Sequence, residues 1–213
     1  MVCSLKYEAR LRALGYSAPA GIDEAGRGCL FGPVTAAAVI LPHPCKIKGL
    51  RDSKIVPPAE RSRLADQIKG EALAWAVAYA SVEEIRKINI LEASRLAMLR
   101  AVQALDPQPD YLLIDAIRIH SPIPQDAIIH GDGISRSIAA ASILAKVDRD
   151  RLLNEFHVRY PGYNLNSNKG YGTRDHLAAL QKYGATPQHR SEFAPVRAVI
   201  EARRTNTPKT GTQ

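Results

Sequence analysis

Apolar positions recur along the chain with two periods, one typical of strands and one typical of helices. Short apolar or β-branched runs predict strands over residues 20–23, 33–41, 75–81, 111–115 and 127–129. Longer periodic stretches predict helices over residues 4–14, 59–72, 82–105 with a break at Asn89, 135–160, 174–183 and 195–204. This order, strands first and then strands alternating with helices, predicts an α/β fold with a mixed sheet flanked by helices.

The last part of the chain differs from the rest because the pattern predicts no strand there. Residues 161–172 form a polar, glycine-rich segment, and the helices around it predict a helical C-terminal extension over about residues 160–204. Residues 205–213 lack large apolar side chains, which predicts a disordered tail. With 213 residues the chain is long enough for a single domain, which we expect to span residues 1–204.

Charge narrows the class of partner. The chain has 29 Lys and Arg against 21 Asp and Glu, a net charge of +8, which favours a polyanionic partner, although a merely soluble basic protein fits equally well. The longest apolar run, residues 34–41, is far shorter than the roughly 20 residues of a membrane-spanning helix. The charged N-terminus does not resemble a signal peptide, and three cysteines without metal-site spacing are typical of a reducing compartment. We therefore expect a cytoplasmic protein with no membrane partner.

Four carboxylates stand where the predicted sheet could bring them together. Asp23 and Asp115 each end an apolar strand, Glu24 follows Asp23, and Asp132 lies between a short strand and a helix. A buried acid needs a compensating cation or hydrogen-bond donors, and Mg²⁺ and Mn²⁺ prefer oxygen ligands. The four acids therefore predict a catalytic site for two divalent ions. The alternative for Asp115 and Asp132 is that each only caps a turn.

Two polar segments offer groups that could bind a sugar–phosphate backbone. Gly26-Arg27-Gly28 follows the acid pair directly, and its glycines let backbone N–H groups approach a ligand closely, although a plain hairpin turn also fits. Ser53 and Lys54 could bind phosphates, or they could belong to a surface loop.

A tyrosine-rich segment over residues 160–176 interleaves aromatic and basic side chains. Such a mixture suits stacking on sugars or bases together with phosphate contact. Tyr171 lies between two glycines and close to Lys169, which favours a functional role for it, whereas for Tyr160 packing against the core is favoured.

Taken in order, these motifs resemble type 2 ribonuclease H, the ribonuclease HII family. The matching motifs are Asp23-Glu24-Ala25-Gly26-Arg27-Gly28, Asp52-Ser53-Lys54, Leu113-Ile114-Asp115, Gly131-Asp132 followed by residues 137–147, and Lys169-Gly170-Tyr171-Gly172-Thr173 with His176. They span roughly residues 20–196, and residues 189–196 resemble the bacterial branch. A set of this extent is far more specific than one short motif.

The resemblance implies an RNase H-like fold with a mixed five-stranded sheet. It also implies Mg²⁺- or Mn²⁺-dependent cleavage of RNA in RNA–DNA hybrids and incision at single ribonucleotides embedded in duplex DNA, as in ribonucleotide excision repair and DNA replication. In the family, the four acid positions bind the metal ions, the loop over residues 26–28 reads the ribose 2′-hydroxyl, and Tyr171 stacks on the next deoxyribose. Ser53, Lys54 and Lys169 complete the expected substrate contacts.

Three positions depart from the family pattern. His130 precedes Gly-Asp where lysine is usual, Ala116 follows Asp115 where glycine is common, and Ile55-Val56 replaces the usual Lys-Leu. A histidine would make a phosphate contact weaker or dependent on pH. None of these changes affects the four acids, so they bear on substrate affinity rather than on the chemistry.

Two other functions remain open at the level of sequence. A non-catalytic binder of hybrid duplexes would retain the groove without turnover, which the intact acids argue against. A nuclease for branched DNA on the same fold is disfavoured by the Gly-Arg-Gly loop and Tyr171. A monomer is the default expectation, and a sliding clamp or the transcription machinery stays open as a partner, although the C-terminal tail shows no clear clamp-binding motif.

Overall fold

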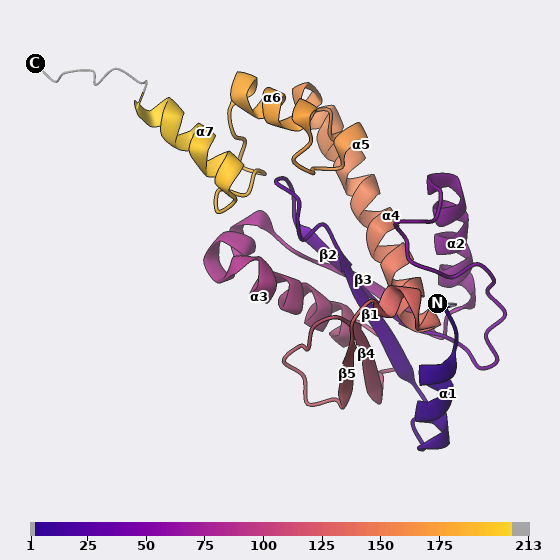
Figure 1. Cartoon of the computed structure of the whole chain (residues 1–213). Coiled ribbons are helices and arrows are strands. Elements are labelled where there is room, and N and C mark those ends of the chain that lie inside the picture. The colour runs from indigo at the N-terminus through magenta and orange to yellow at the C-terminus, as the bar shows by residue number, and fades with distance from the viewer. Residues whose placement is uncertain (1–2, 206–213) are drawn as a thin grey trace, which may run out of the picture.

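In the computed structural model, which describes residues 3–205, the strands form a single mixed sheet. The strands are β1 (Pro19–Ala25), β2 (Val34–Ile40), β3 (Ala74–Ala80), β4 (Tyr111–Asp115) and β5 (Gln125–Ile128). Their order across the sheet is β3-β2-β1-β4-β5, with β2 antiparallel to both neighbours and β1, β4 and β5 parallel to one another (Figure 1). This arrangement is the mixed five-stranded sheet that the sequence predicts.

The helices also follow the predicted pattern closely. They are α1 (Lys6–Ala13), α2 (Pro58–Glu71), α3 (Val82–Gln103), α4 (Arg136–Arg159), α5 (Leu165–Asn168), α6 (Arg174–Tyr183) and α7 (Ala194–Thr205), with short 3₁₀ turns η1 (Gly131–Gly133) and η2 (Pro161–Tyr163). The predicted break is present at Asn89, whose φ is 66°. None of the helices within residues 3–205 has the length and apolar character needed to cross a membrane.

Most element boundaries differ from the predictions by one or two residues, and three differences change the description of an element. β5 begins at Gln125 rather than at residue 127, because an edge strand tolerates polar residues that the apolar pattern does not reveal. The short helix α5 lies inside the segment expected to be a loop. Thr205, the first residue of the predicted tail, ends α7, and the rest of that tail, residues 206–213, lies outside the described residues.

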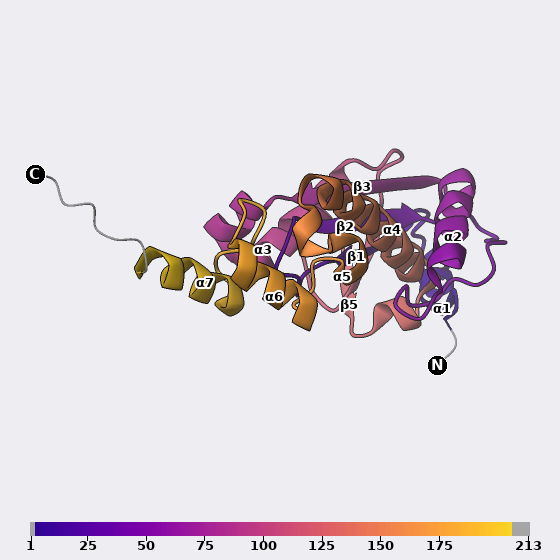
Figure 2. The ribbon, with the colours of Figure 1, turned by 90° about the horizontal axis from the view of Figure 1, so that it is seen from above.

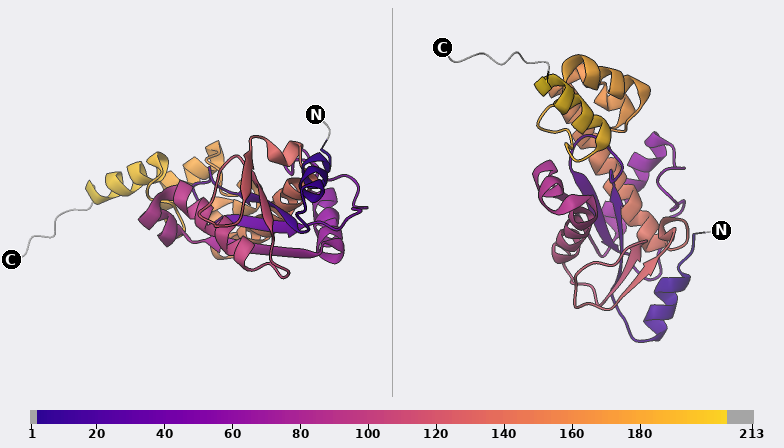
Figure 3. Two further views of the ribbon diagram at one scale, coloured as in Figure 1. Left: turned by 90° about the horizontal axis from the view of Figure 1, so that it is seen from below. Right: turned by 60° about the vertical axis from the view of Figure 1, so that its left-hand side comes forward.

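Helices cover both faces of the sheet. α3 packs on one face, where Ile85, Ala97 and Met98 meet the side chains of the central strands. α4 packs on the opposite face, and α2 lies beyond it (Figure 1). α6 and α7 lie past the far end of α4, away from α1, and form the helical C-terminal extension that the sequence predicts (Figures 2 and 3).

The closest contact between sheet and helix is at Gly21 of β1. A Cβ atom at this position would lie 2.0 Å from the backbone carbon of Ser137 in α4. Because real Cβ contacts are never this short, only glycine lets α4 approach the strand so closely. The contact brings the start of α4 next to the first half of β1, two residues before Asp23.

Glu8 is a buried acid that joins α1 to the start of α4. Its Oε1 accepts hydrogen bonds from the hydroxyls of Ser135 and Ser137, both at 2.7 Å, and from the Ser137 N–H at 2.9 Å. An acid is favourable at a helix N-terminus because the first N–H groups lack helical partners and carry partial positive charge. Asp132 lies in η1, just before α4, so Glu8 also stabilises the turn that carries Asp132.

Ala116 is one of the departures from the family pattern, and its backbone conformation explains why glycine is usual at this position. It directly follows β4 with a φ of 58°, and it is exposed. His130, another departing residue, also has a positive φ, 57°, and an exposed side chain. A left-handed conformation is unfavourable for alanine and easy for glycine, which accounts for the usual glycine after this aspartate.

We expect Ala116→Gly to raise the free energy of unfolding by about 0.5–1 kcal/mol, because relief of the strained φ outweighs the greater flexibility of glycine in the unfolded chain. Urea denaturation measures the change. Ala127→Gly, at an exposed position of β5, is the matched control and should lower stability instead. A fall in stability for Ala116→Gly would show that the backbone relaxes at no cost.

Candidate active site

The predicted acids gather at one edge of the sheet, where parallel strands end. β1 and β4 pair with Ile22 beside Ile114, so Asp23 and Asp115 come next in their strands. Side chains alternate between the faces of a strand, and Gly21, two residues before Asp23, faces α4. Asp23 and Asp115 therefore share the face that α4 covers.

The other two acids adjoin this pair. Glu24 follows Asp23 in β1, and Asp132 lies in η1, after β5, the neighbour of β4. The charge of Asp132 acts on Asp115, and the charge of Asp115 acts on Glu24. The structure thus brings all four predicted acids together at one place.

Burial and mutual repulsion raise the pKa values of Asp23, Glu24 and Asp115. Asp23 is 4% exposed, and its pKa is raised well above the usual value by burial and then by the charges of Glu24 and Asp115. Burial also raises the pKa of Glu24, against the opposing effect of Arg27. The pKa of Asp115 is raised by burial and by the charge of Asp132. Both causes disfavour the ionised form, so the cluster lacks positive charge.

Protein donors compensate part of this charge. Arg27 Nη1 lies 3.0 Å from Glu24 Oε1, and the ammonium of Lys54 lies 3.0 Å from Asp132 Oδ2. The N–H of Gly131 donates to Asp115 Oδ1 at 2.7 Å.

The arrangement is not a ready-made metal cage. Among residues 3–205, no group of three or more Asp, Glu, His or Cys side chains is positioned to hold a metal ion. The acids instead point to separate donors, and the Lys54 ammonium supplies a positive charge at Asp132. The set nevertheless fits a divalent cation, because Oε2 of Glu24 is buried without a hydrogen-bond partner and the acids repel one another.

Ser53 has a different place from the one expected of a phosphate ligand. Its side chain is buried, and its hydroxyl shares a hydrogen bond of 2.8 Å with the hydroxyl of Ser142 in α4. A hydrogen bond from Ser142 in turn lowers the pKa of Asp23. Ser53 is therefore linked to Asp23 through Ser142, inside the protein. The neighbouring Lys54 is exposed.

The Gly-Arg-Gly loop directly follows β1 and reaches the protein surface beside the acids. Gly26 has a φ of +90°, and a Cβ atom there would lie 2.1 Å from the guanidinium of Arg149, so only glycine fits. Gly28 is exposed, with open space where a Cβ atom would point. Because Arg27 pairs with Glu24, the loop is fixed directly to the acid cluster.

The tyrosine segment lies against this loop. The N–H of Leu30 donates to the Gly170 carbonyl at 2.8 Å, and the Tyr171 side chain next to it is 46% exposed. Lys169 is half-buried, with its Nζ 2.9 Å from Oδ1 of Asn154. Tyr160 packs with its ring centroid 5.8 Å from that of Phe31, in line with the expected packing role.

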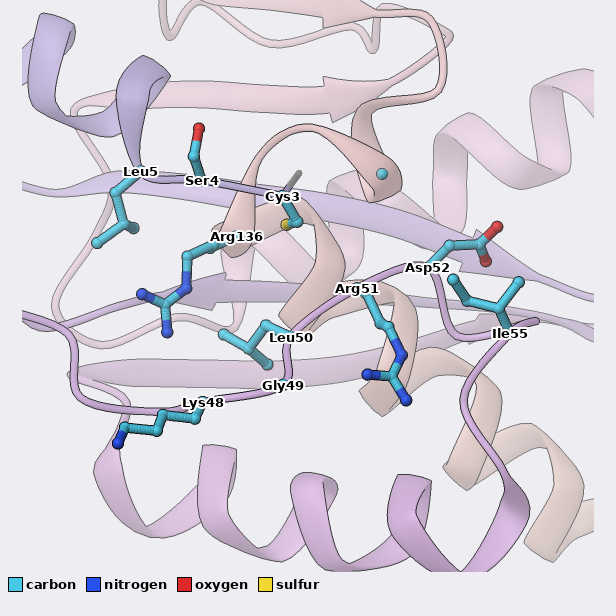
Figure 4. Close-up of a pocket in the computed structure, with 11 residues that line it drawn as sticks. Cys3, Ser4, Leu5, Lys48, Gly49, Leu50, Arg51, Asp52, Ile55 and Arg136 are labelled. Carbon is cyan, nitrogen blue, oxygen red and sulfur yellow. The ribbon is translucent and has the colours of Figure 1, made fainter. Parts of the chain in front are cut away.

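A pocket of about 670 Å³ lies beside the acid cluster and was not foreseen from the sequence. Figure 4 shows that its basic residues, Lys48, Arg51 and Arg136, come from the loop before α2 and from the start of α4. Asp52 and Gly133 also line it, next to Lys54 and Asp132 in the chain. The cluster of acids is therefore flanked by a hollow lined by three basic residues together with apolar side chains, and one of the three, Arg51, pairs with Glu60.

Comparison with known proteins assigns most of this chain to one family. The family model of ribonuclease HII matches residues 20–196. A ribonuclease HII of Geobacillus kaustophilus is 50% identical over 198 residues, covering 93% of this chain and 76% of that protein. A ribonuclease HII of Bacillus licheniformis is 54% identical over 192 residues, covering 90% and 75%.

Solved structures show the same fold at lower identity. The ribonuclease H2 of Pyrococcus horikoshii has a TM-score of 0.70 at 22% identity, covering 89% of this chain and 100% of that chain. The ribonuclease HII of Archaeoglobus fulgidus, solved in complex with PCNA, has a TM-score of 0.68 at 21% identity, covering 83% and 95%. Because the family model spans most of the sequence and two relatives are 50% and 54% identical over at least nine-tenths of it, this chain belongs to the ribonuclease HII family, whose members are metal-dependent endoribonucleases of the RNase H type.

Proposed function

We propose that this protein cleaves the RNA strand of RNA–DNA hybrids and also incises duplex DNA on the 5′ side of a single embedded ribonucleotide, leaving a 3′-hydroxyl and a 5′-phosphate. The observation that carries the proposal is the position of the acid cluster. Through the Arg27–Glu24 ion pair it adjoins a loop with an exposed glycine, and that loop lies against Tyr171. Groups able to cleave a phosphodiester thus stand beside groups able to read a sugar.

The acids Asp23, Glu24, Asp115 and Asp132 are the residues that would hold Mg²⁺ or Mn²⁺. Two such ions, when bound, lower the pKa of the attacking water and stabilise charge on the departing 3′-oxygen. The protein itself contributes no nucleophile to this reaction. Lys54 pairs with Asp132 and is exposed, so its ammonium would be available to a substrate phosphate.

The two loops supply the specificity in this proposal. A 2′-hydroxyl is what distinguishes RNA from DNA at a given position, and the backbone of residues 26–28 can approach it closely. A flat ring such as that of Tyr171 packs better on a sugar that lacks this hydroxyl. Lys48 and Arg136, which line the pocket beside the acids, supply positive charge that supports binding of the phosphate backbone.

The partners follow the same reasoning. We infer that the substrate duplex is the main partner, and that a sliding clamp is a candidate because an archaeal relative was solved with PCNA. A monomer stays our expectation for the protein alone.

Three labelled duplexes test the proposal: all DNA, an RNA–DNA hybrid, and DNA with one ribonucleotide. Each is incubated with Mg²⁺, with Mn²⁺ or with EDTA and analysed on a denaturing gel. We expect cleavage of the last two duplexes only, only with a divalent ion, and with a product that a ligase can use from its 5′-phosphate. No cleavage of the hybrid, together with a shift of that duplex on a native gel, would identify a hybrid-binding module, and cleavage of the all-DNA duplex would identify a different nuclease.

A further inference from the structure

We propose that His189 and Arg190 act together as a junction clamp, a pair of adjacent buried side chains that holds the Gly26–Gly28 loop and Tyr171 in a fixed relative position. The clamp would make the enzyme select a ribonucleotide that is followed by a deoxyribonucleotide. This inference rests on the proposed function, because it assigns specificity to the same two loops. Neither residue contacts the acid cluster, so each is a positioning residue.

Arg190 is the half of the clamp that holds the Gly-Arg-Gly loop. Its buried guanidinium donates from Nη1 to the carbonyl of Arg27 at 2.9 Å, from Nε to that of Gly32 at 2.8 Å and from Nη2 to that of Pro33 at 3.1 Å. No carboxylate within residues 3–205 pairs with it. Its hydrogen-bonding capacity is therefore used to fix backbone carbonyls on both sides of the turn.

The bond to the Arg27 carbonyl has a consequence for Gly28. In a trans peptide the C=O and the following N–H point in opposite directions. Since the Arg27 carbonyl faces the buried guanidinium, the Gly28 N–H faces away from it, toward the exposed side of the loop. Arg190 thus presents a donor to the place where a sugar hydroxyl would lie.

His189 is the half of the clamp that reaches Tyr171. The Thr186 N–H donates to its Nδ1 at 3.0 Å, so the proton of the neutral ring is on Nε2. This Nε2–H faces Nε2 of His176 at 3.3 Å, and His176 Nδ1–H in turn donates to the Tyr171 carbonyl at 2.8 Å. One set of tautomers satisfies every bond, and it connects the C-terminal segment to Tyr171 through two rings.

The protonation of both histidines agrees with this chain of bonds. Burial and the neighbouring His176 lower the pKa of His189 to about 3, and burial lowers the pKa of His176. Both rings are therefore neutral at neutral pH, as the chain requires, because a doubly protonated ring could not accept a bond.

The backbone joins the two halves. The N–H of Arg190 donates to the Leu30 carbonyl at 2.8 Å, and the N–H of Leu30 donates to the Gly170 carbonyl at 2.8 Å. A displacement of residues 189–190 would therefore move both reading loops at once.

The burial of two arginines close together, Arg149 and Arg190, lowers the stability of the folded protein. Burial and the nearby charge of Arg149 lower the pKa of Arg190 to about 9. Arg149 is also buried and donates to the Phe31 carbonyl at 3.0 Å. Two like charges in one interior are unfavourable, and an apolar pair would pack without that penalty. Their shared feature is that both hold the segment of residues 27–33.

The test compares kcat/KM on a duplex with one embedded ribonucleotide and on an all-RNA hybrid strand. His189→Phe keeps the ring among Phe31 and Tyr163 but breaks the chain of bonds, and Arg190→Met removes the guanidinium. We expect kcat/KM of each variant to fall about tenfold or more on the embedded ribonucleotide and less than about threefold on the hybrid. The difference between the two losses corresponds to the contribution of one or two buried hydrogen bonds. His189→Gln, which keeps a donor toward His176, should recover part of the loss.

Two further measurements separate positioning from simple destabilisation. Met98→Ala, on the buried face of α3, is the control for lost stability and should leave the ratio between the two substrates unchanged. In a double variant, His189→Phe should add little to the loss caused by Tyr171→Ala, because both act through the same ring. If His189→Phe does not fold, His176→Phe breaks the same chain and takes its place.

The outcomes are distinct. If the wild-type protein leaves the embedded ribonucleotide intact, the proposed function fails and the clamp fails with it. If the wild type incises but the variants lose both substrates by the same factor, or if the double variant shows the product of the single losses, the clamp alone is overturned.

Discussion

Asp23→Asn should reduce cleavage of an RNA–DNA hybrid by about 100- to 1,000-fold and at the same time make the metal-free protein more stable. The first effect follows because Asp23 is the buried acid between Glu24 and Asp115, and loss of one preorganised charge from such a site costs on the order of 100- to 1,000-fold even where neighbours remain. A gel assay with Mg²⁺ measures the first effect, and thermal unfolding in EDTA measures the second.

The second effect follows from the sign of the pKa shift. The folded state raises the pKa of Asp23 above its ordinary value of about 3.9, so the folded state binds the proton more tightly than the unfolded state. The stability of the wild-type protein in EDTA therefore falls as pH rises from about 4 toward neutrality, whereas asparagine has no proton to lose. The variant should melt higher at pH 7, and Mg²⁺ should stabilise the wild type much more than the variant.

Asp66→Asn makes the same chemical change at an exposed position of α2 and should alter neither activity nor the response to Mg²⁺. Cleavage by Asp23→Asn at a tenth of the wild-type rate or more would remove Asp23 from the catalytic set. A lower melting temperature in EDTA would instead contradict the repulsion argued for the acid cluster.

Tyr171→Ala should lower kcat/KM on a duplex with one embedded ribonucleotide by about 10- to 100-fold. Stacking of an aromatic ring in nucleic-acid complexes contributes about 1–3 kcal/mol, and each 1.4 kcal/mol corresponds to a factor of ten. Because the ring is 46% exposed beside the Gly-Arg-Gly loop, its removal should change substrate contact more than folding. Single-turnover cleavage of the embedded-ribonucleotide duplex measures the loss.

Two control variants test whether the loss is due to the ring of Tyr171. Tyr171→Phe keeps the ring and should stay within about threefold of the wild type. Tyr183→Ala removes a tyrosine of similar exposure, 50%, from α6 and should leave the ratio between embedded ribonucleotide and hybrid unchanged. An unaltered rate for Tyr171→Ala would exclude Tyr171 from the substrate site.

The fold and the gathering of acids were predictable because both depend on patterns that the sequence displays. An apolar run ending in an acid, as in Leu113-Ile114-Asp115, indicates a buried strand with its acid at the carboxyl end. Parallel neighbours place such ends at one edge, which is where the structure has Asp23 and Asp115. The roles of the individual acids stay predictions that the substitutions above test.

The side chains that hold the site were not predictable in the same way. Glu8 and Arg190 are charged residues, a type usually found at the surface. Only the packing of α1 and of the C-terminal segment buries them. The link between Ser53 and Asp23 depends on Ser142, which belongs to α4 and is distant in sequence. The separate donors that hold the acids apart from a common metal position likewise depend on side-chain orientation, which no periodicity encodes.

The contact of Gly21 with Ser137 has a consequence for the chemistry at some distance from it. Asp23 stands two residues after Gly21, and Asp132 stands five residues before Ser137. The distance between β1 and α4 at this contact therefore sets how far apart the two acids lie. A single methyl group at residue 21 would act as a wedge between them. The spacing of the acids is thus governed by an absent side chain, at a position buried inside the protein.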